Sequence, residues 1–135
     1  MKPLLAPVSP GELLDKITIL RIKSARMTDA AKLVNVRHEL ATLQATWHEC
    51  IGDADAVAGE ERALEAVNAR LWEIEDQIRD EEAAQRFGAR FIELARSVYI
   101  ENDERARIKK RINEVLGSDL VEEKSYRPYL QRPPK

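Results

Sequence analysis

The amino-acid sequence predicts an all-α protein, a four-helix bundle of antiparallel helix hairpins with an extended C-terminal tail. In four segments, apolar residues recur at alternating spacings of three and four, which is the period of an amphipathic helix. Charged residues make up 34% of the chain and hydrophobic residues 44%, whereas only five glycines occur among 135 residues. This composition is typical of long charged helices around one core, and we find no alternating pattern of a strand.

The first helix is expected at residues 10–27. Ser9 stands at the N-cap, Pro10 at the first helical position and Glu12 at the third. We expect the serine oxygen and the glutamate carboxylate to satisfy two backbone N–H groups reciprocally. Apolar residues then occupy two opposite faces: Leu13, Ile17 and Leu20 on one, Ile19 and Ile22 on the other. A helix that is apolar on both sides is expected at the centre of the bundle or at a subunit contact.

Two further helices are expected at residues 30–50 and 60–84. Asp29 offers an N-cap after a link so short that the first two helices must form an antiparallel hairpin. The third helix could begin as early as Asp55, because Gly52 breaks the preceding pattern and Gly59 weakens the next one. Its apolar stripe contains Leu64, Val67, Leu71, Ile74 and Ile78.

The fourth helix is expected at residues 89–116. Gly88 is a candidate N-cap, and Gly117 stands where a left-handed C-cap residue is wanted. Prolines 128, 133 and 134 disfavour further helix, so we divide the chain into a helical bundle domain at 1–125 and an extended or disordered tail at 126–135.

The charge pattern argues against two classes of partner. With a net charge of −2, the chain has no overall basic field, and we expect it to bind neither nucleic acid nor a membrane. Residues 52–85 hold eleven acids and three arginines, a balance of −8, whereas residues 86–117 hold eight bases and five acids, a balance of +3. These two segments are expected to pack against each other. The single cysteine, Cys50, favours a reducing compartment, and we expect a cytoplasmic protein.

We predict no metal site, no cofactor and no catalytic residue. The pair Glu73 and Asp76 has helical spacing that can hold magnesium, but both side chains point away from the apolar stripe. Glu12 is expected to be engaged in its cap. The basic run at residues 107–111 is expected to be solvated. No phosphate loop, nucleophile elbow or paired metal-ligand motif is present in the sequence.

Asp15 lies on the second apolar face of the 10–27 helix, between Ile19 and Ile22. If this face is buried, the carboxylate needs a partner or must take up a proton. The alternative is that the face is only partly buried and that Asp15 remains in contact with water. The sequence favours this second interpretation.

The apolar stripe of the 89–116 helix is interrupted at Asn102 and Arg105. These side chains cost stability in a core unless they are paired. One interpretation is a polar layer that fixes the register of the helices, with Arg105 paired to an acid of the 60–84 helix. The other is a pocket in which Arg105 binds a carboxylate or phosphate. Glu75 and Arg79 are placed to line the same layer, so the candidate ligand-binding residues are Asp15, Glu75, Arg79, Asn102 and Arg105.

Four segments of the chain resemble a bacterial family of small domains of unknown function. They are SPGELLDKITIL at residues 9–20, LWEIED at 71–76, FIELARSVY at 91–99 and GSDLVEEKSY at 117–126. The resemblance implies a bacterial source and a discrete domain, and it implies no substrate. A weaker similarity is to the all-helical chorismate mutases, which use inward arginines to hold a dicarboxylate; Arg105 is the clearly inward arginine here, and their arginine early in the first helix has no counterpart.

These observations favour a non-enzymatic module that works through protein contacts, as a homo-oligomer or with a protein partner. The rival hypothesis is a protein or enzyme that binds a small anionic ligand in an inter-helix pocket around Arg105. The two-sided apolar helix at 10–27 supports the first hypothesis, and the polar interruption at Asn102 and Arg105 supports the second.

Overall fold

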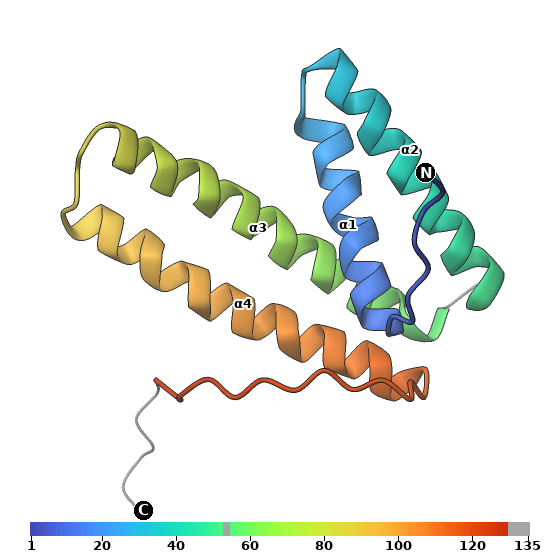
Figure 1. Cartoon of the computed structure of the whole chain (residues 1–135). Helices are drawn as coiled ribbons and strands as arrows, with labels where there is room; N and C mark the ends of the chain where they lie inside the picture. Colours follow the sequence, from blue (N-terminus) through green and yellow to red (C-terminus); the bar gives the residue numbers. More distant parts are fainter. Residues whose placement is uncertain (53–54, 130–135) are drawn as a thin grey trace, which may run out of the picture.

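The computed structural model describes residues 1–52 and 55–129 and contains four α-helices (Figure 1). These are α1 (Pro10–Arg26), α2 (Ala30–Cys50), α3 (Ala58–Ala83) and α4 (Ala89–Val115), with a 3₁₀ turn, η1 (Asp55–Val57), directly before α3. The described ranges contain no strand. The predicted all-α bundle is therefore confirmed, with helix bounds within about two residues of those expected.

The helices begin and end at the capping residues that the sequence offers. Ser9 Oγ accepts a hydrogen bond from Glu12 N at 3.2 Å, and Asp29 Oδ1 accepts one from Lys32 N at 3.0 Å. Gly117 has a φ of +66° after the end of α4. The reciprocal half of the first cap was predicted wrongly, because the Glu12 carboxylate accepts a hydrogen bond from Lys109 Nζ of α4 at 2.6 Å.

Two antiparallel hairpins, α1–α2 and α3–α4, meet at one end and diverge at the other, like the arms of a V (Figure 1). Helix α1 contacts all three other helices, whereas α2 contacts only α1 among the helices described. The centre of the bundle is therefore made by α1, α3 and α4, and α2 is attached to its outside. Of the two places expected for the doubly apolar helix, the structure shows the centre of the bundle.

The most deeply buried side chains lie where the two hairpins meet. This cluster comes from four elements and consists of Leu14, Val57, Leu64, Val67, Ile108 and Ile112, and Trp47 at the end of α2 packs against it. Away from this region burial falls quickly: α2 contains no buried residue, and Leu94 is the one buried residue between positions 69 and 107.

Helices α1 and α4 approach each other closely at Gly11. A Cβ atom added at this glycine would lie 2.5 Å from the backbone oxygen of Lys109. The Gly11 N–H donates a hydrogen bond to Asn113 Oδ1 at 2.7 Å, so a side chain of α4 satisfies one free N–H group of the α1 terminus. The absence of a side chain at Gly11 thus fixes how α1 and α4 fit together.

After Gly117 the chain turns back and runs along α4 as an extended segment (Figure 1). Residues 118–129 contain no helix or strand, and the Tyr129 ring packs edge-on against Tyr99 of α4 with 4.9 Å between ring centroids. Residues 130–135 of the predicted tail lie outside the described residues. Within the described part of the chain, no helix is long and apolar enough to cross a membrane.

Candidate functional site

Asp15 and Arg105 form a buried ion pair between α1 and α4. The Arg105 Nε donates to Asp15 Oδ1 at 2.8 Å, and its Nη2 donates to Asp15 Oδ2, so the contact is bidentate. The Asp15 side chain is 1% exposed and that of Arg105 30%. The expectation that Asp15 stays in contact with water was wrong, because α1 is buried on both faces. Arg105 is indeed paired with an acid, but the acid belongs to α1 and not to α3.

The Asp15 carboxylate has further partners from α3 and α4. Asn68 Nδ2 donates to Asp15 Oδ1 at 2.9 Å and to Thr18 Oγ1 at 3.0 Å, and Lys109 Nζ lies 3.9 Å from Asp15 Oδ2. Among the described residues no buried side-chain nitrogen or oxygen lacks a hydrogen-bond partner. A fully satisfied network of this kind fixes the relative positions of α1, α3 and α4.

The pairing limits what Arg105 can bind. Its hydrogen bonds to Asp15 raise the pKa of Arg105 above the usual value, so the guanidinium stays charged. Two of its three nitrogens are occupied by Asp15, and the third, Nη1, has a 3.5 Å contact with Asn102 Oδ1. The similarity to chorismate mutases implied a free inward arginine, whereas this one already holds a carboxylate of its own chain.

Lys109 belongs to the same region and was missed by the sequence analysis. Its Nζ donates to Glu12 Oε2 at 2.6 Å and lies 3.4 Å from Glu122 Oε2 in the C-terminal segment. The side chain is 12% exposed, although the basic run at 107–111 was expected to be solvated. Its position four residues after Arg105 places it on the same helix face, and this spacing was the signal that could have identified it.

One face of α4 thus carries a continuous polar stripe at spacings of three, four and four residues. Asn102, at its start, is exposed, so the expected core-facing position is wrong for this residue. We call Asn102, Arg105, Lys109 and Asn113 the polar stripe of α4. It binds α1 at three points: the carboxylate of Asp15, the carboxylate of Glu12 and the N–H group of Gly11. The polar interruption predicted at Asn102 and Arg105 is therefore part of a longer series.

Four of the five predicted site residues line one groove between the hairpins, the inter-hairpin groove, with a volume of about 470 Å³. Its apolar surface comes from Ile19, Ile22, Leu71, Trp72 and Val98, and its polar residues are Asn68, Glu75, Asp76, Arg79, Asn102 and Arg105. Glu75 and Arg79 are exposed and pair with each other at 3.1 Å. Asp15 does not line this groove, but it lies against Arg105.

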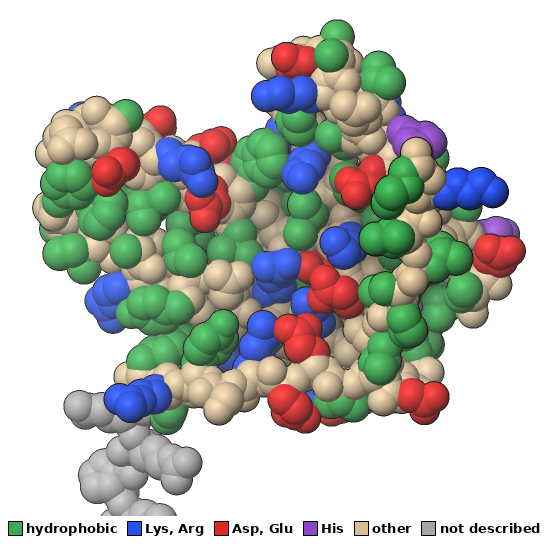
Figure 2. All heavy atoms as spheres, viewed as in Figure 1, with side chains coloured by type: hydrophobic (Ala, Val, Ile, Leu, Met, Phe, Trp, Pro, Cys, Tyr) green, Lys and Arg blue, Asp and Glu red, His purple; other side chains and the backbone are tan. Residues whose placement is uncertain are grey.

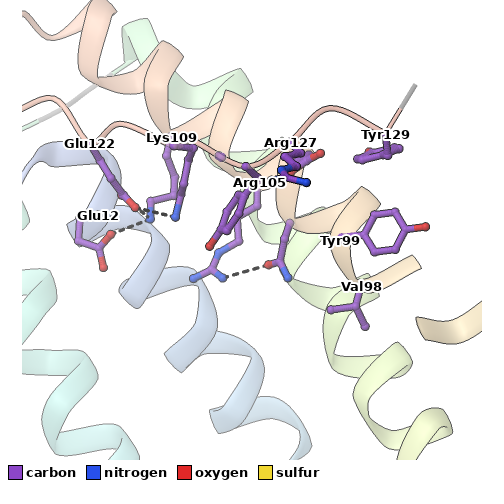
Figure 3. Close-up of a pocket in the computed structure, with 13 residues that line it drawn as sticks. Glu12, Val98, Tyr99, Arg105, Lys109, Glu122, Arg127 and Tyr129 are labelled. Carbon is purple, nitrogen blue, oxygen red and sulfur yellow. Dashed lines mark hydrogen bonds and ion pairs between the residues drawn. The ribbon is translucent and has the colours of Figure 1, made fainter. Parts of the chain in front are cut away.

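A second and larger groove, the tail groove, lies between α4 and the C-terminal segment and has a volume of about 780 Å³ (Figure 3). It shares Val98, Asn102 and Arg105 with the inter-hairpin groove. Figure 2 shows basic and acidic side chains interspersed at the middle of the face along which the segment runs. Hydrogen bonding from Lys124 lowers the pKa of Glu122, which also contacts Lys109, so this part of the groove is already ion-paired.

The ion pairs of α3 differ from the pattern expected from its charge. Arg70 of α3 pairs with Glu101 of α4 at 3.0 Å, so the base comes from the acidic segment and the acid from the basic one. Acids of α3 instead meet α1, where Arg26 pairs with Glu73 and Arg21 lies 3.8 Å from Glu61. One pair follows the expected direction, since Glu81 at the end of α3 pairs with Arg86 of the basic segment at 3.0 Å.

The described residues include no group of three or more His, Cys, Asp or Glu side chains placed to hold a metal ion. Of the carboxylates considered for magnesium, Glu73 pairs with Arg26 and Glu12 with Lys109. Cys50 is exposed at the C-terminal end of α2.

The comparison with known families gives one match. The chain belongs to a family of unknown function (DUF6165), whose sequence model covers residues 4–135. This confirms the resemblance to an uncharacterised family of small domains. Neither the curated proteins nor the solved structures that were compared give a significant match.

Proposed function

We propose that this chain is a non-enzymatic protein-interaction module that assembles with a second copy of itself. The observation that carries the proposal is the exposed surface. The chain exposes 10002 Å², whereas a compact monomer of 15.4 kDa is expected to expose roughly 7,200 Å². The exposed area above the expected value is therefore larger than the roughly 800 Å² that each partner buries in a standard protein interface.

Part of this surface belongs to the extended ends of the chain, where Leu5 is 97% and Tyr126 79% exposed, and part to the α3–α4 hairpin. Trp72 and Leu71 are only half-buried in the inter-hairpin groove, and no further helix of the described chain covers them. Along the diverging α3–α4 hairpin, Phe87 is 50% exposed, Ile92 55% and Ile100 42%. We place the contact in the inter-hairpin groove, because clustered apolar side chains that stay exposed mark interaction sites.

Charge favours a second copy as the occupant. The segment 52–85 carries −8 and the segment 86–117 carries +3, and among the described residues Asp76, Asp80 and Glu82 of α3 form no ion pair with a base of α4. In a two-fold dimer the same patch meets itself, so α3 of one protomer can lie against α4 of the other. Such pairing brings the acidic surface of one protomer against the basic surface of the other. It also disfavours orientations of the two protomers in which like charges meet.

The test is the mass of the protein in solution, measured by light scattering after size exclusion at micromolar to high micromolar concentration. We expect a mass of twice 15.4 kDa. Trp72→Glu, which places a charge in the inter-hairpin groove, should yield a folded monomer. Val34→Glu is the matched control, because Val34 is 66% exposed on α2 and lies outside this groove. A parent protein that stays monomeric throughout would rule out the proposal.

The rival hypothesis of an anion site centred on Arg105 is weakened by the occupation of its guanidinium by Asp15. An anion would need further donors, which the tail groove offers.

We also propose a cytoplasmic location, because the single cysteine, Cys50, cannot form an intrachain disulfide. A bacterial source is proposed from the resemblance described above.

A further inference from the structure

We propose that the tail groove binds a small ligand that combines a flat ring with one anionic group, such as a nucleoside monophosphate or an aryl carboxylate. This inference goes beyond self-assembly, and apart from Val98 and Arg105 the residues that carry it lie outside the inter-hairpin groove. The groove has about 780 Å³, within the range of roughly 300–1,000 Å³ for small-molecule sites. One wall is α4, and the other is the extended segment 122–129.

Aromatic side chains form one end of the groove. Tyr99 from α4 and Tyr129 from the C-terminal segment pack edge-on against each other at this end, whereas Tyr126, the third tyrosine of the lining, lies beside Lys124, 5.9 Å from Nζ to ring centroid. Val98 adds an aliphatic surface beside them (Figure 3). Tyrosine rings bind flat rings by stacking, which contributes about 1–3 kcal/mol per stacked base in nucleic-acid complexes. This end therefore fits the ring of the ligand.

Two arginines of the groove lining retain hydrogen-bonding capacity for a ligand. Arg127 comes from the C-terminal segment and makes no ion pair with any residue in the described ranges. Arg105 comes from α4, and its Nη1 has only the long 3.5 Å contact with Asn102 (Figure 3). Two guanidinium groups from opposite walls can bind one carboxylate or phosphate by charge-assisted hydrogen bonds.

The other end of the groove is already neutralised, and this limits the charge of the ligand. Lys109 contacts Glu12 and Glu122, and Lys124 pairs with Glu122 at 2.9 Å. Four bases and three acids line the groove, and the Asp15 carboxylate bound to Arg105 brings the local balance to zero. A ligand with one anionic group fits this balance, whereas a triphosphate would bring excess negative charge toward the acids.

The C-terminal segment is held mainly by side chains. In the described part of the chain, no backbone hydrogen bond joins the segment to the bundle beyond Ser118, whose N–H bonds to the oxygen of Asn113 at 2.9 Å. Such a segment opens at low free-energy cost, and a ligand that bridges both walls stabilises the closed form. Binding should therefore slow tryptic cleavage after Lys124, whereas the bond after Arg127 is not a tryptic site because Pro128 follows it.

The experiment is calorimetric titration of the full chain with AMP and benzoate, each compared with a probe that lacks one feature. Adenosine lacks the anion, inorganic phosphate lacks the ring, and ATP carries excess charge. We expect AMP, benzoate or both to bind, and each incomplete probe and ATP to bind at least about tenfold more weakly. Binding of AMP alone identifies a phosphate ligand, and binding of benzoate alone identifies a carboxylate ligand.

Arg127→Ala removes a donor without breaking an ion pair among the described residues, and we expect the affinity to fall by about tenfold or more. Arg37→Ala is the matched control, an exposed arginine on α2 outside the groove, and it should leave affinity unchanged. If neither complete probe binds more tightly than about 1 mM, or if Arg127→Ala binds as the parent does, the proposal is overturned. Binding that persists in monomeric Trp72→Glu would separate this site from self-assembly.

Discussion

The region where the hairpins meet and the region where they diverge are made of the same helices but differ in the number of helices that cover each apolar side chain. Where they meet, α1, α3 and α4 surround the cluster centred on Leu14, Leu64 and Ile112, each 0% exposed. Where they diverge, α2 contacts only α1, and the far part of α3–α4 is a bare hairpin. We call these two regions the base and the arms.

The comparison shows that similar apolar stripes can be buried to different extents. The stripe of α2 has the same spacing as that of α3, yet Leu33, Leu40 and Trp47 are only half-buried, whereas Leu64 and Val67 are fully buried. Hydrophobic stabilisation follows the area removed from water, not the pattern in the sequence. Folding of the monomer should thus depend mainly on the base, while the arms remain available for other contacts.

The largest effect is expected from Arg105→Met at the edge of the base. The change leaves the Asp15 carboxylate, which is 1% exposed, without its guanidinium partner. We expect a loss of about 3–5 kcal/mol in the free energy of unfolding measured with urea. Asp15→Leu combined with Arg105→Met should recover most of the loss, because no unpaired buried charge remains. A single variant as stable as the parent would show that the pair contributes nothing to the base.

Leu64→Ala and Leu40→Ala compare the base and the arms directly. Leu64 is 0% exposed, and its truncation should cost about 3 kcal/mol through lost burial and a cavity. Leu40 on α2 is half-buried, and the same truncation should cost about 1 kcal/mol. Equal losses for the two variants in urea unfolding would contradict the difference between the regions.

Gly11→Ala tests the close approach of α1 and α4. The added Cβ would lie 2.5 Å from a backbone oxygen, which cannot move as a flexible side chain can, so we expect a loss of about 2 kcal/mol. Gly59→Ala at the start of α3 is the control. Its nearest atom outside the local helix backbone lies at 3.9 Å, and alanine there should be neutral or stabilising by thermal unfolding.

The smallest effect is expected in the arms from Arg79→Ala. Arg79 pairs with Glu75 across one helical turn, and both side chains are more than half exposed, at 80% and 54%. Such a pair contributes less than about 0.5 kcal/mol, so the melting temperature of the monomeric form should hardly change. A large destabilisation would mean that the arms contribute more to the fold than their exposure indicates.

Local signals in the sequence were sufficient to predict where each helix begins and ends. Asp29 and Gly117 placed an N-cap and a C-cap because capping depends on backbone groups within a few residues. The central place of α1 was one of two options offered by its two apolar faces. The position of α2 outside the core was not predictable, since its stripe gives no information on how many helices will cover it.

The candidate site was predicted less completely, because its contacts join residues about a hundred positions apart. The periodicity of α4 identified Arg105 and Asn102, but not that Asp15, 90 residues earlier, occupies the arginine. Lys109 was assigned to a solvated basic run although its spacing from Arg105 placed it on the inward face. Glu12 was assigned to the N-cap of α1 because its spacing from Ser9 fits a cap. Its actual partner, Lys109, is 97 residues away, and no local pattern indicates it.

The contacts of the polar stripe have a consequence for synthesis of the protein. Gly11 and Asn113, which bond at 2.7 Å, are separated by 102 residues, so α1 cannot complete its N-terminus until nearly all of α4 has been made. At about 5–20 residues per second, α1 waits roughly 5–20 s with both apolar faces exposed. Until α3 has been made, only α2 can cover it, on one side. The hairpin partner that contributes least to the finished core is therefore the first to shield the helix at its centre while the chain is on the ribosome.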